Sequence, residues 1–216
     1  MSSSNPDPGN PGRGKLFIIA APSGAGKTSL VNELLQRDSR LVLSISHTTR
    51  SARPGEIDGQ HYHFVSEADY EQMVKNGDFM EHAQVFDHFY GSNRNSVALQ
   101  LEAGHDVILE IDWQGARQVQ SVFPDSCLIF IIPPSLEALR ERLTGRGQDS
   151  TSVIQRRMRD ARAEISHWAE FDHLVVNDDF NTALEELLAI INDHRTRQPR
   201  KVNKDYQLLA QQLGSS

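Results

Sequence analysis

Residues 15–35, KLFIIAAPSGAGKTSLVNELL, constrain the fold of this chain more than any other stretch. The apolar run Leu16–Ala20 is followed by a loop of small residues, and then by a pattern that places apolar side chains on one helical face. A buried strand, a glycine-containing loop and a helix in this order are the context that a phosphate-binding loop requires. We therefore predict a nucleoside triphosphate site here, in preference to an ordinary glycine-rich turn.

The loop has the residue types that such a site needs. Gly24 and Gly26 can adopt positive φ, which lets successive backbone N–H groups turn inward around a phosphate chain. The helix that begins near Lys27 adds the positive end of its dipole, and the ammonium group of Lys27 can reach the β- and γ-phosphates. The hydroxyl group of Thr28 can bind Mg²⁺. Ala21 replaces the glycine that usually opens this pattern, which costs little if Ala21 keeps a negative φ.

Composition argues against several other functional classes. The net charge of −7 disfavours a general nucleic-acid binder, whose domain is usually basic. The single cysteine, Cys127, excludes an intramolecular disulfide and fits a reducing compartment. No apolar run approaches the roughly 20 residues of a membrane span, and the first dozen residues lack the apolar core of a signal peptide. We expect a cytoplasmic protein with a disordered N-terminal tail.

Strand patterns near residues 16, 42, 107, 128 and 174 alternate with helical patterns. This alternation predicts an α/β fold with an open parallel sheet and helices on both faces. The interval of about 46–95 breaks the alternation and predicts an inserted subdomain that contains β-structure. Within these regions we expect a strand over 41–46, a short antiparallel strand over 58–65 and a helix over 67–75. Ligands of such sheets gather at the carboxyl ends of the strands.

The segment after the second strand carries two arginines, Arg50 and Arg53, three positions apart. The planar guanidinium group matches the oxygens of a phosphate, so this pair could hold a second phosphate group. Spacing alone leaves the alternative of two solvated loop arginines equally open.

Three acidic residues are further candidates. Glu81 lies near several aromatic residues, and a carboxylate in such a pocket could accept hydrogen bonds from the N–H edge of a purine; alone it would be a surface glutamate. A strand pattern that ends in Glu110 and Asp112 places both on one face. Such carboxylates beside a phosphate loop hold Mg²⁺ or its waters, although a polar strand terminus is the alternative.

Arginines also gather around a predicted helical hairpin near the polar loop TGRGQDS. On a mobile flap they could close over a triphosphate and neutralise the charge of the transferred group. Some of them could instead pair with acids of their own helix, Asp160 and Glu164. The group consists of Arg142, Arg146, Arg156, Arg157 and Arg159. Histidines 47, 61, 63, 82 and 88 show no spacing typical of a zinc site.

Taken together, these segments resemble those of bacterial guanylate kinases over roughly residues 14–195. The motifs that carry the resemblance are APSGAGKTSL, SISHTTRSARPGEIDGQHYHFV, FMEHAQVFDHFYGS, LEIDWQGA, IIPPS, RLTGRGQDS and VVNDD. The resemblance implies the fold of the P-loop nucleoside monophosphate kinases, with a GMP-binding insertion over about 46–95 and a helical lid over about 136–168. We expect a tail over 1–13 and a polar C-terminal extension over 196–216.

The resemblance also implies roles for individual residues. Glu81 and Ser46 match the positions that read guanine, and Glu110 stands where some members of the family have aspartate. The other positions implied for GMP are Arg50, Arg53, Tyr62, Tyr90 and Ser92. Those implied for ATP are Ala21, Pro22, Ser23, Gly24, Ala25, Gly26, Lys27, Thr28 and Asn177. Catalytic roles fall to Lys27, Arg50 and the lid arginines Arg142, Arg146 and Arg157, and Mg²⁺ would be held by Thr28 and, through water, by Asp112.

The implied activity is transfer of the γ-phosphoryl group of ATP to GMP with Mg²⁺, and dGMP remains open as an acceptor. Neither a nucleic acid nor a membrane is an expected partner, and the oligomeric state, monomer or homodimer, is not predicted. Three alternatives remain: a non-catalytic peptide-binding module of the same fold, a kinase that acts on a phosphorylated ribose, and another nucleoside monophosphate kinase. Intact Lys27 and Thr28 disfavour the first, and Glu81 disfavours the other two.

Overall fold

The computed structural model describes residues 12–85, 87–145, 151–198 and 203–215. Its core is a five-stranded sheet in the order β2-β7-β1-β8-β9, in which every pair of neighbours is parallel. The predicted parallel sheet is therefore confirmed. The strands are β1 (Leu16–Ala20), β2 (Leu41–Leu43), β7 (Asp106–Glu110), β8 (Cys127–Ile132) and β9 (His173–Val176).

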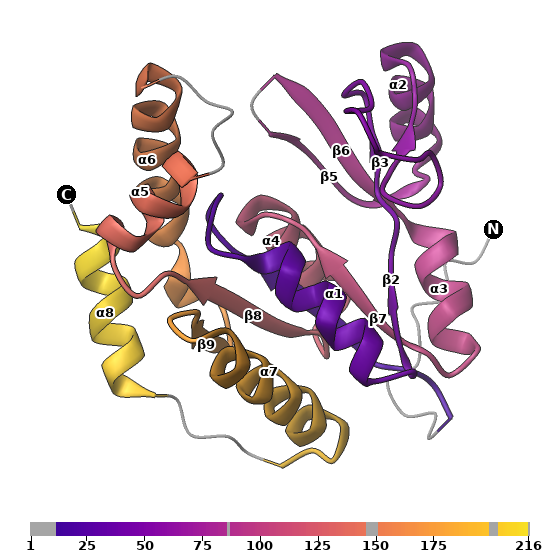
Figure 1. Ribbon diagram of the computed structural model, residues 1–216. Coiled ribbons are helices and arrows are strands. Elements are labelled where there is room, and N and C mark those ends of the chain that lie inside the picture. The colour runs from indigo at the N-terminus through magenta and orange to yellow at the C-terminus, as the bar shows by residue number, and fades with distance from the viewer. Residues whose placement is uncertain (1–11, 86, 146–150, 199–202, 216) are drawn as a thin grey trace.

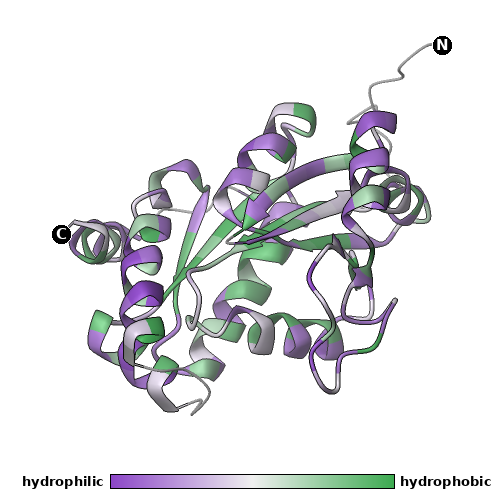
Figure 2. Cartoon of the chain, turned by 90° about the horizontal axis from the view of Figure 1, so that it is seen from above, coloured by the Kyte–Doolittle hydropathy of each residue, from purple (hydrophilic) through white to green (hydrophobic). Residues whose placement is uncertain are grey.

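Helices cover both faces of this sheet (Figure 1). Alternate residues of β1 point to opposite faces: Phe17 and Ile19 belong to one buried apolar cluster, and Leu16 and Ile18 to the other. The first cluster includes α1 (Lys27–Arg37) and α7 (Phe180–Arg195), and the second includes α3 (Arg94–Glu102) and α4 (Trp113–Val122). Figure 2 shows the resulting pattern, with apolar central strands and polar outer surfaces on the helices.

Residues 46–93 form a second sheet, in the order β4-β3-β6-β5. Its long hairpin consists of β5 (Phe79–Val85) and β6 (His88–Asn93), and its short strands are β3 (His47–Thr48) and β4 (His63–Phe64). The helix α2 (Glu67–Asn76) completes the insertion; as predicted, it begins after Ser66, whose side chain accepts a hydrogen bond from the backbone of Asp69.

Two strands expected in this region are present but differ from the prediction. β2 ends at Leu43, because the chain leaves the core sheet over residues 44–46 to enter the second sheet. β4 has two residues and pairs with β3 in parallel, instead of forming an antiparallel strand over 58–65. Residues 49–62 form a connection long enough to bring the chain back in the same direction, which a tight hairpin could not do.

The helices α5 (Leu136–Gly145) and α6 (Thr151–Ile165) pack through a small apolar cluster that contains Leu139, Leu143, Ile154 and Ala161. In Figure 1 this pair lies on one side of the amino end of α1, and the hairpin β5–β6 lies on the other side. After the 3₁₀ turn η1 (Trp168–Glu170), the last described helix, α8 (Lys204–Gly214), buries Ala210 and Leu213 against residues of α6, β8 and β9. The domain boundaries proposed from the sequence stay predictions.

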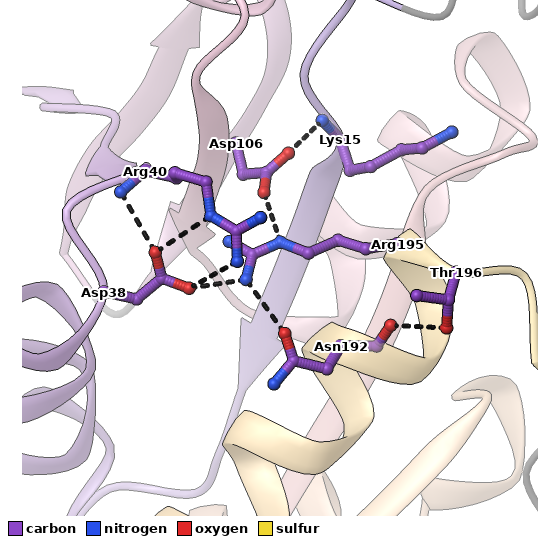
Figure 3. Close-up of polar contacts among 7 residues, drawn as sticks. All are labelled: Lys15, Asp38, Arg40, Asp106, Asn192, Arg195 and Thr196. Atoms are coloured by element: carbon purple, nitrogen blue, oxygen red, sulfur yellow. Dashed lines mark hydrogen bonds and ion pairs between the residues drawn. The ribbon is translucent and has the colours of Figure 1, made fainter.

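At the amino ends of the strands, Arg195 joins three separate segments (Figure 3). Its Nε atom donates to Oδ2 of Asp106 and its Nη1 atom donates to Oδ2 of Asp38, each at 2.5 Å. The other carboxylate oxygen of Asp106 accepts the backbone N–H of Lys15 at 2.6 Å. This network ties the end of α7 to the start of β7 and to the residue that follows α1. In the described part of the chain, no helix combines the length and the apolar character needed to cross a membrane.

Candidate functional site

The loop between β1 and α1 has the conformation expected of a phosphate-binding loop. Gly24 and Gly26 have φ values of 94° and 93°, a region that favours glycine. Ala21 is not among the residues with positive φ, which confirms that alanine is tolerated at the first position of the motif. Because α1 begins directly at Lys27, the N–H groups of its first turn lack partners within the helix and face the loop.

Contacts from distant segments hold this loop. The side-chain amide of Asn177 donates to the carbonyl oxygen of Ala25 at 2.7 Å, and a Cβ atom on Gly26 would lie 2.3 Å from the same amide nitrogen. Arg142 in turn donates to the carbonyl oxygen of Asn177 at 2.8 Å. A cavity of about 370 Å³ adjoins these residues, and its lining includes Gly24, Gly26, Ser29, Arg142, Asn177, Asp178 and Phe180.

The lysine and hydroxyl groups of the motif point toward the end of β7. Lys27 Nζ donates to the carbonyl oxygen of Ile111 at 3.3 Å, and Thr28 Oγ1 donates to Glu110 Oε1 at 2.6 Å. Asp112 is the N-cap of α4, because its Oδ1 atom accepts the backbone N–H of Gly115 at 2.9 Å. The structure therefore brings Thr28 and Glu110 into direct contact. The strand pattern places Glu110 near Mg²⁺, as this contact does, whereas the family resemblance places it near GMP.

A second cavity, of about 310 Å³, lies between the phosphate loop and the insertion. Most of the predicted base- and phosphate-binding side chains of the insertion line it together with the loop. The insertion contributes Ser46, Tyr62, Glu81 and Tyr90, the end of β7 and the N-cap of α4 contribute Glu110 and Asp112, and the loop contributes Ala21, Pro22, Ser23, Gly24, Gly26, Lys27 and Thr28. Of the other described candidates for GMP, Arg50, Arg53 and Ser92 lie outside this lining.

Arg50 lies behind the aromatic residues of the cavity. Its guanidinium group is over the rings of Tyr62 and Phe64, at 5.3 and 5.8 Å from the centroids, and its Nη2 atom donates to Glu56 at 2.8 Å. The other carboxylate oxygen of Glu56 accepts the backbone N–H of Arg53, whose side chain is exposed. Sequence analysis missed Glu56. The Pro54-Gly55 pair in the sequence could have indicated this contact, because a turn centred on these residues brings residue 56 back toward residue 53.

Glu81 is the most buried acidic side chain of the site, with an exposed fraction of 3%. Burial raises the pKa of Glu81 to about 7, because the ionised form loses its hydration. Ser92 lies opposite Glu81 on the neighbouring strand and is fully buried. Neither Glu81 Oε1 nor Ser92 Oγ makes a hydrogen bond of normal geometry within the protein. Such buried groups are costly unless a ligand satisfies them.

Helix α6 reaches the phosphate loop through two charged residues. Arg157 Nη2 donates to the hydroxyl group of Ser23 at 3.0 Å, and Glu164 Oε2 accepts the backbone N–H of Ser23 at 3.2 Å. Burial raises the pKa of Glu164 to about 7, against the opposing effect of Lys27. Sequence analysis had offered Glu164 as a partner for the arginines of its own helix. The seven-residue spacing between 157 and 164, which places both on one face, could have indicated a common target. Arg146 lies outside the described residues.

The remaining predictions concern metals. Among the described residues, no cluster of three or more histidine, cysteine, aspartate or glutamate side chains could hold a metal ion by itself.

Comparisons with known proteins agree with this geometry. Residues 13–194 match the family model described as guanylate kinase. The chain is 54% identical over 200 residues to a guanylate kinase of Chromohalobacter salexigens, with 93% of each chain covered. It is 57% identical over 185 residues to that of Hahella chejuensis, covering 86% of this chain and 89% of the relative. The crystal structure of guanylate kinase from Anaplasma phagocytophilum superposes with a TM-score of 0.70 at 32% identity, covering 88% of each chain.

Proposed function

This chain belongs to the guanylate kinase family and transfers a phosphoryl group from ATP to GMP, and we propose that the two substrates meet in the cavity between the phosphate loop and the insertion. One observation carries this assignment. The buried carboxyl group of Glu81, whose Oε1 atom lacks a hydrogen-bond partner, lines the same cavity as the phosphate loop, so the proposed base-recognition residue and the phosphate-binding loop face the same cavity.

Glu81 is the proposed reader of guanine. Its carboxylate would accept hydrogen bonds from the N1–H and the 2-amino group of the base, with Ser46 and Ser92 nearby. Adenine lacks both donors, so AMP would leave the carboxylate buried and unpaired. A polar group that is desolvated without a partner gives strong discrimination, of roughly 10⁴-fold where the site is built to bond it.

The phosphate of GMP is the proposed ligand of Arg50, Arg53, Tyr62 and Tyr90. In the free protein Glu56 holds the guanidinium group of Arg50 against the ring of Tyr62. Glu56 therefore restricts Arg50 to one orientation before GMP binds. Preorganisation of this kind reduces the entropy lost when the charged side chain engages the phosphate.

On the ATP side, the backbone of residues 21–28 and the ammonium group of Lys27 would hold the phosphates. Asn177 and Arg142 line the adjoining cavity of about 370 Å³, which we assign to the adenosine part. Arg142 has a further buried nitrogen, Nη1, without a partner, and Arg157 already contacts the loop. A catalytic role for Arg146 follows from the family resemblance alone.

The donor set fits Mg²⁺ carried by the substrate. Thr28 Oγ1 and Glu110 offer adjacent oxygens, and Asp112 lines the same cavity. Mg²⁺ commonly keeps several waters and binds one or two protein oxygens together with substrate phosphates. We assign Thr28 as a direct ligand and Asp112 as a ligand through water. When bound, the ion would neutralise charge on the β- and γ-phosphates.

Catalysis then needs positioning and charge neutralisation, and no nucleophilic side chain. Lys27 and the lid arginines would stabilise the charge on the transferred group while the GMP phosphate attacks in line. Closure of α5 and α6 would exclude water, which would otherwise compete as the acceptor. The fully buried thiol of Cys127 has no part in this scheme and is compatible with a cytoplasmic location.

A coupled assay of ADP release tests the proposal. Mg-ATP is supplied with GMP, dGMP, AMP, UMP, dTMP or ribose 1,5-bisphosphate, and the same panel is run with Glu81→Gln. We expect turnover with GMP, little with AMP, and a loss of GMP use in the variant that far exceeds any change in the KM for ATP. Equal losses for both substrates would remove Glu81 from base recognition, and turnover of the ribose compound alone would replace the substrate assignment.

A further inference from the structure

Gly115, in the first turn of α4, lies directly against the carboxyl group of Glu81. A Cβ atom at this position would be 2.6 Å from Glu81 Oε2 and 3.2 Å from Glu81 Cδ. The first distance is shorter than any ordinary van der Waals contact. The absence of a side chain at residue 115 therefore creates the space that the carboxylate occupies.

Backbone conformation does not explain this glycine. Gly115 is not among the glycines with positive φ, so an L-amino acid could adopt its helical conformation. Glycine inside a helix is also less favourable than alanine by about 1 kcal/mol. The helix would form more readily with alanine at this position, and the neighbouring Glu81 is the closest group that a methyl group would meet.

The backbones on both sides of this contact are held in place, so the Glu81 side chain would have to adjust. The backbone N–H of Gly115 is bonded to Asp112, and residues 112–116 form the capped start of α4. Gln118, one turn further on, bonds to both backbone groups of His82: it accepts from the N–H at 3.1 Å and donates to the carbonyl oxygen at 2.9 Å. Since His82 directly follows Glu81, these bonds fix the distance between α4 and β5 at the position of the carboxylate.

We propose that Gly115 is a specificity-determining positioning residue, which sets the depth of the Glu81 carboxylate and thereby the selection of guanine. A side chain at residue 115 would push Oε2 toward the base and away from the position in which both oxygens can accept hydrogen bonds. This inference rests on the proposed role of Glu81. A misplacement of about 1 Å at such a contact can cost on the order of 100-fold.

The test is steady-state kinetics of Gly115→Ala with GMP and AMP as acceptors. We expect the KM for GMP to rise by about 10- to 100-fold and the GMP-over-AMP preference to fall, while the KM for ATP stays within about twofold. The melting temperature should change little, because alanine favours the helix and the group that must shift is the end of the Glu81 side chain. Gln120→Ala, an exposed change in the same helix, is the matched control and should leave every kinetic constant near the wild-type value.

A double-mutant cycle with Glu81→Asp distinguishes an effect of the contact between residue 115 and the Glu81 carboxylate from a general disturbance of the fold. Aspartate is one methylene shorter, so its carboxylate would not reach residue 115, and the effect of Gly115→Ala should be much smaller in that background. If Gly115→Ala itself folds poorly, the double variant still tests the inference, because the shorter aspartate would relieve the clash and restore folding.

The outcomes distinguish this inference from the proposed function. A large loss of GMP use in Glu81→Gln with no effect of Gly115→Ala would overturn the inference alone. No effect of Glu81→Gln would overturn the proposed function as well. Equal losses for GMP and ATP in Gly115→Ala, with the same losses in the Glu81→Asp background, would show general damage and also contradict the inference.

Discussion

The two ends of the core sheet differ in whether their buried polar and charged groups have partners within the protein. At the amino ends, Arg195 makes ion pairs with Asp38 and Asp106, each with a side-chain exposure of 14% or less. Around the cavities at the carboxyl ends, several polar groups have an atom without a partner. Six buried side-chain polar groups of the described residues lack a hydrogen-bond partner at one atom, and three of them belong to Glu81, Ser92 and Arg142, which are proposed to bind substrates. Arg195 is also in this set through Nη2, but its other two nitrogens are bonded.

Because of this difference, we expect substitutions at the two ends to affect different properties of the protein. Paired charges at the amino ends stabilise the fold, and their loss should appear in unfolding measurements. Unpaired groups at the carboxyl ends reduce stability until a ligand satisfies them, so their loss should appear in catalysis. The following predictions, from the largest expected effect to the smallest, test this division.

Lys27→Met should reduce kcat by about 10⁴-fold, because it removes the cation that is proposed to neutralise charge on the transferred phosphoryl group. The free energy of unfolding should change little, since the ammonium group makes one bond of 3.3 Å at the surface of the cavity. Stopped-flow kinetics and urea unfolding on the same sample give both quantities. A comparable loss of stability and activity would mean that Lys27 is structural.

Arg195→Met should lower the free energy of unfolding by about 3–5 kcal/mol, because the buried carboxylate of Asp106 would lose its cation and Asp38 would keep only its longer contacts with Arg40. The kinetic constants of the folded fraction should stay near the wild-type values. Arg37→Met is the matched control: its pairs with Glu33 and Glu185 are exposed, so it should cost less than about 1 kcal/mol. Equal effects of the two substitutions would contradict the network.

Stability of the ligand-free protein should fall by about 3 kcal/mol between pH 4.5 and pH 7 through Glu81 alone. The pKa of Glu81 is raised by burial from 4.5 to about 7 in the folded state, so the folded protein binds more protons than the unfolded chain in this interval. Urea unfolding across this pH range, compared between wild type and Glu81→Gln, isolates the contribution. The same slope in both proteins would refute it.

Asp38 should show the opposite dependence, with a magnitude of about 2 kcal/mol. Burial alone would raise the pKa of Asp38, but hydrogen bonds from Arg195 and Arg40 lower it from 3.8 to about 2. The stabilisation is therefore present above pH 3.8 and is lost as the pH falls toward 2. Acid unfolding of Asp38→Asn should lack this component, and an unchanged acid transition would argue against it.

Glu164→Ala should raise the KM for ATP about fivefold, since it removes the acceptor of the Ser23 backbone N–H and loosens α6 from the phosphate loop. Glu164→Gln keeps an acceptor oxygen and should stay within about twofold of wild type. If the glutamine variant is as impaired as the alanine variant, the charge of Glu164 matters more than its hydrogen bond.

Local sequence predicted the parts of this molecule that depend on local interactions. In residues 15–35, a continuous apolar run predicts the strand, two glycines predict the loop, and the helical spacing of apolar residues predicts the helix. The other core strands are predicted by continuous apolar runs. The contacts that complete the site join residues far apart: Glu164 and Ser23 are separated by 141 positions, and Arg195 and Asp38 by 157. Such pairs depend on how the helices pack. The family resemblance supplied candidate residues. It did not predict the contact of Thr28 with Glu110 or the contact of Gly115 with Glu81.

Proton release on GMP binding tests the central claim most directly. With its pKa at about 7, Glu81 is about half protonated at pH 7 in the free protein, and two N–H donors from guanine would favour its ionised form. Calorimetric titrations in buffers of different ionisation enthalpy should therefore show about half a proton more released by wild type than by Glu81→Gln. Protons from the GMP phosphate cancel in this difference. Equal proton release by the two proteins would mean that the carboxyl group of Glu81 does not meet the base.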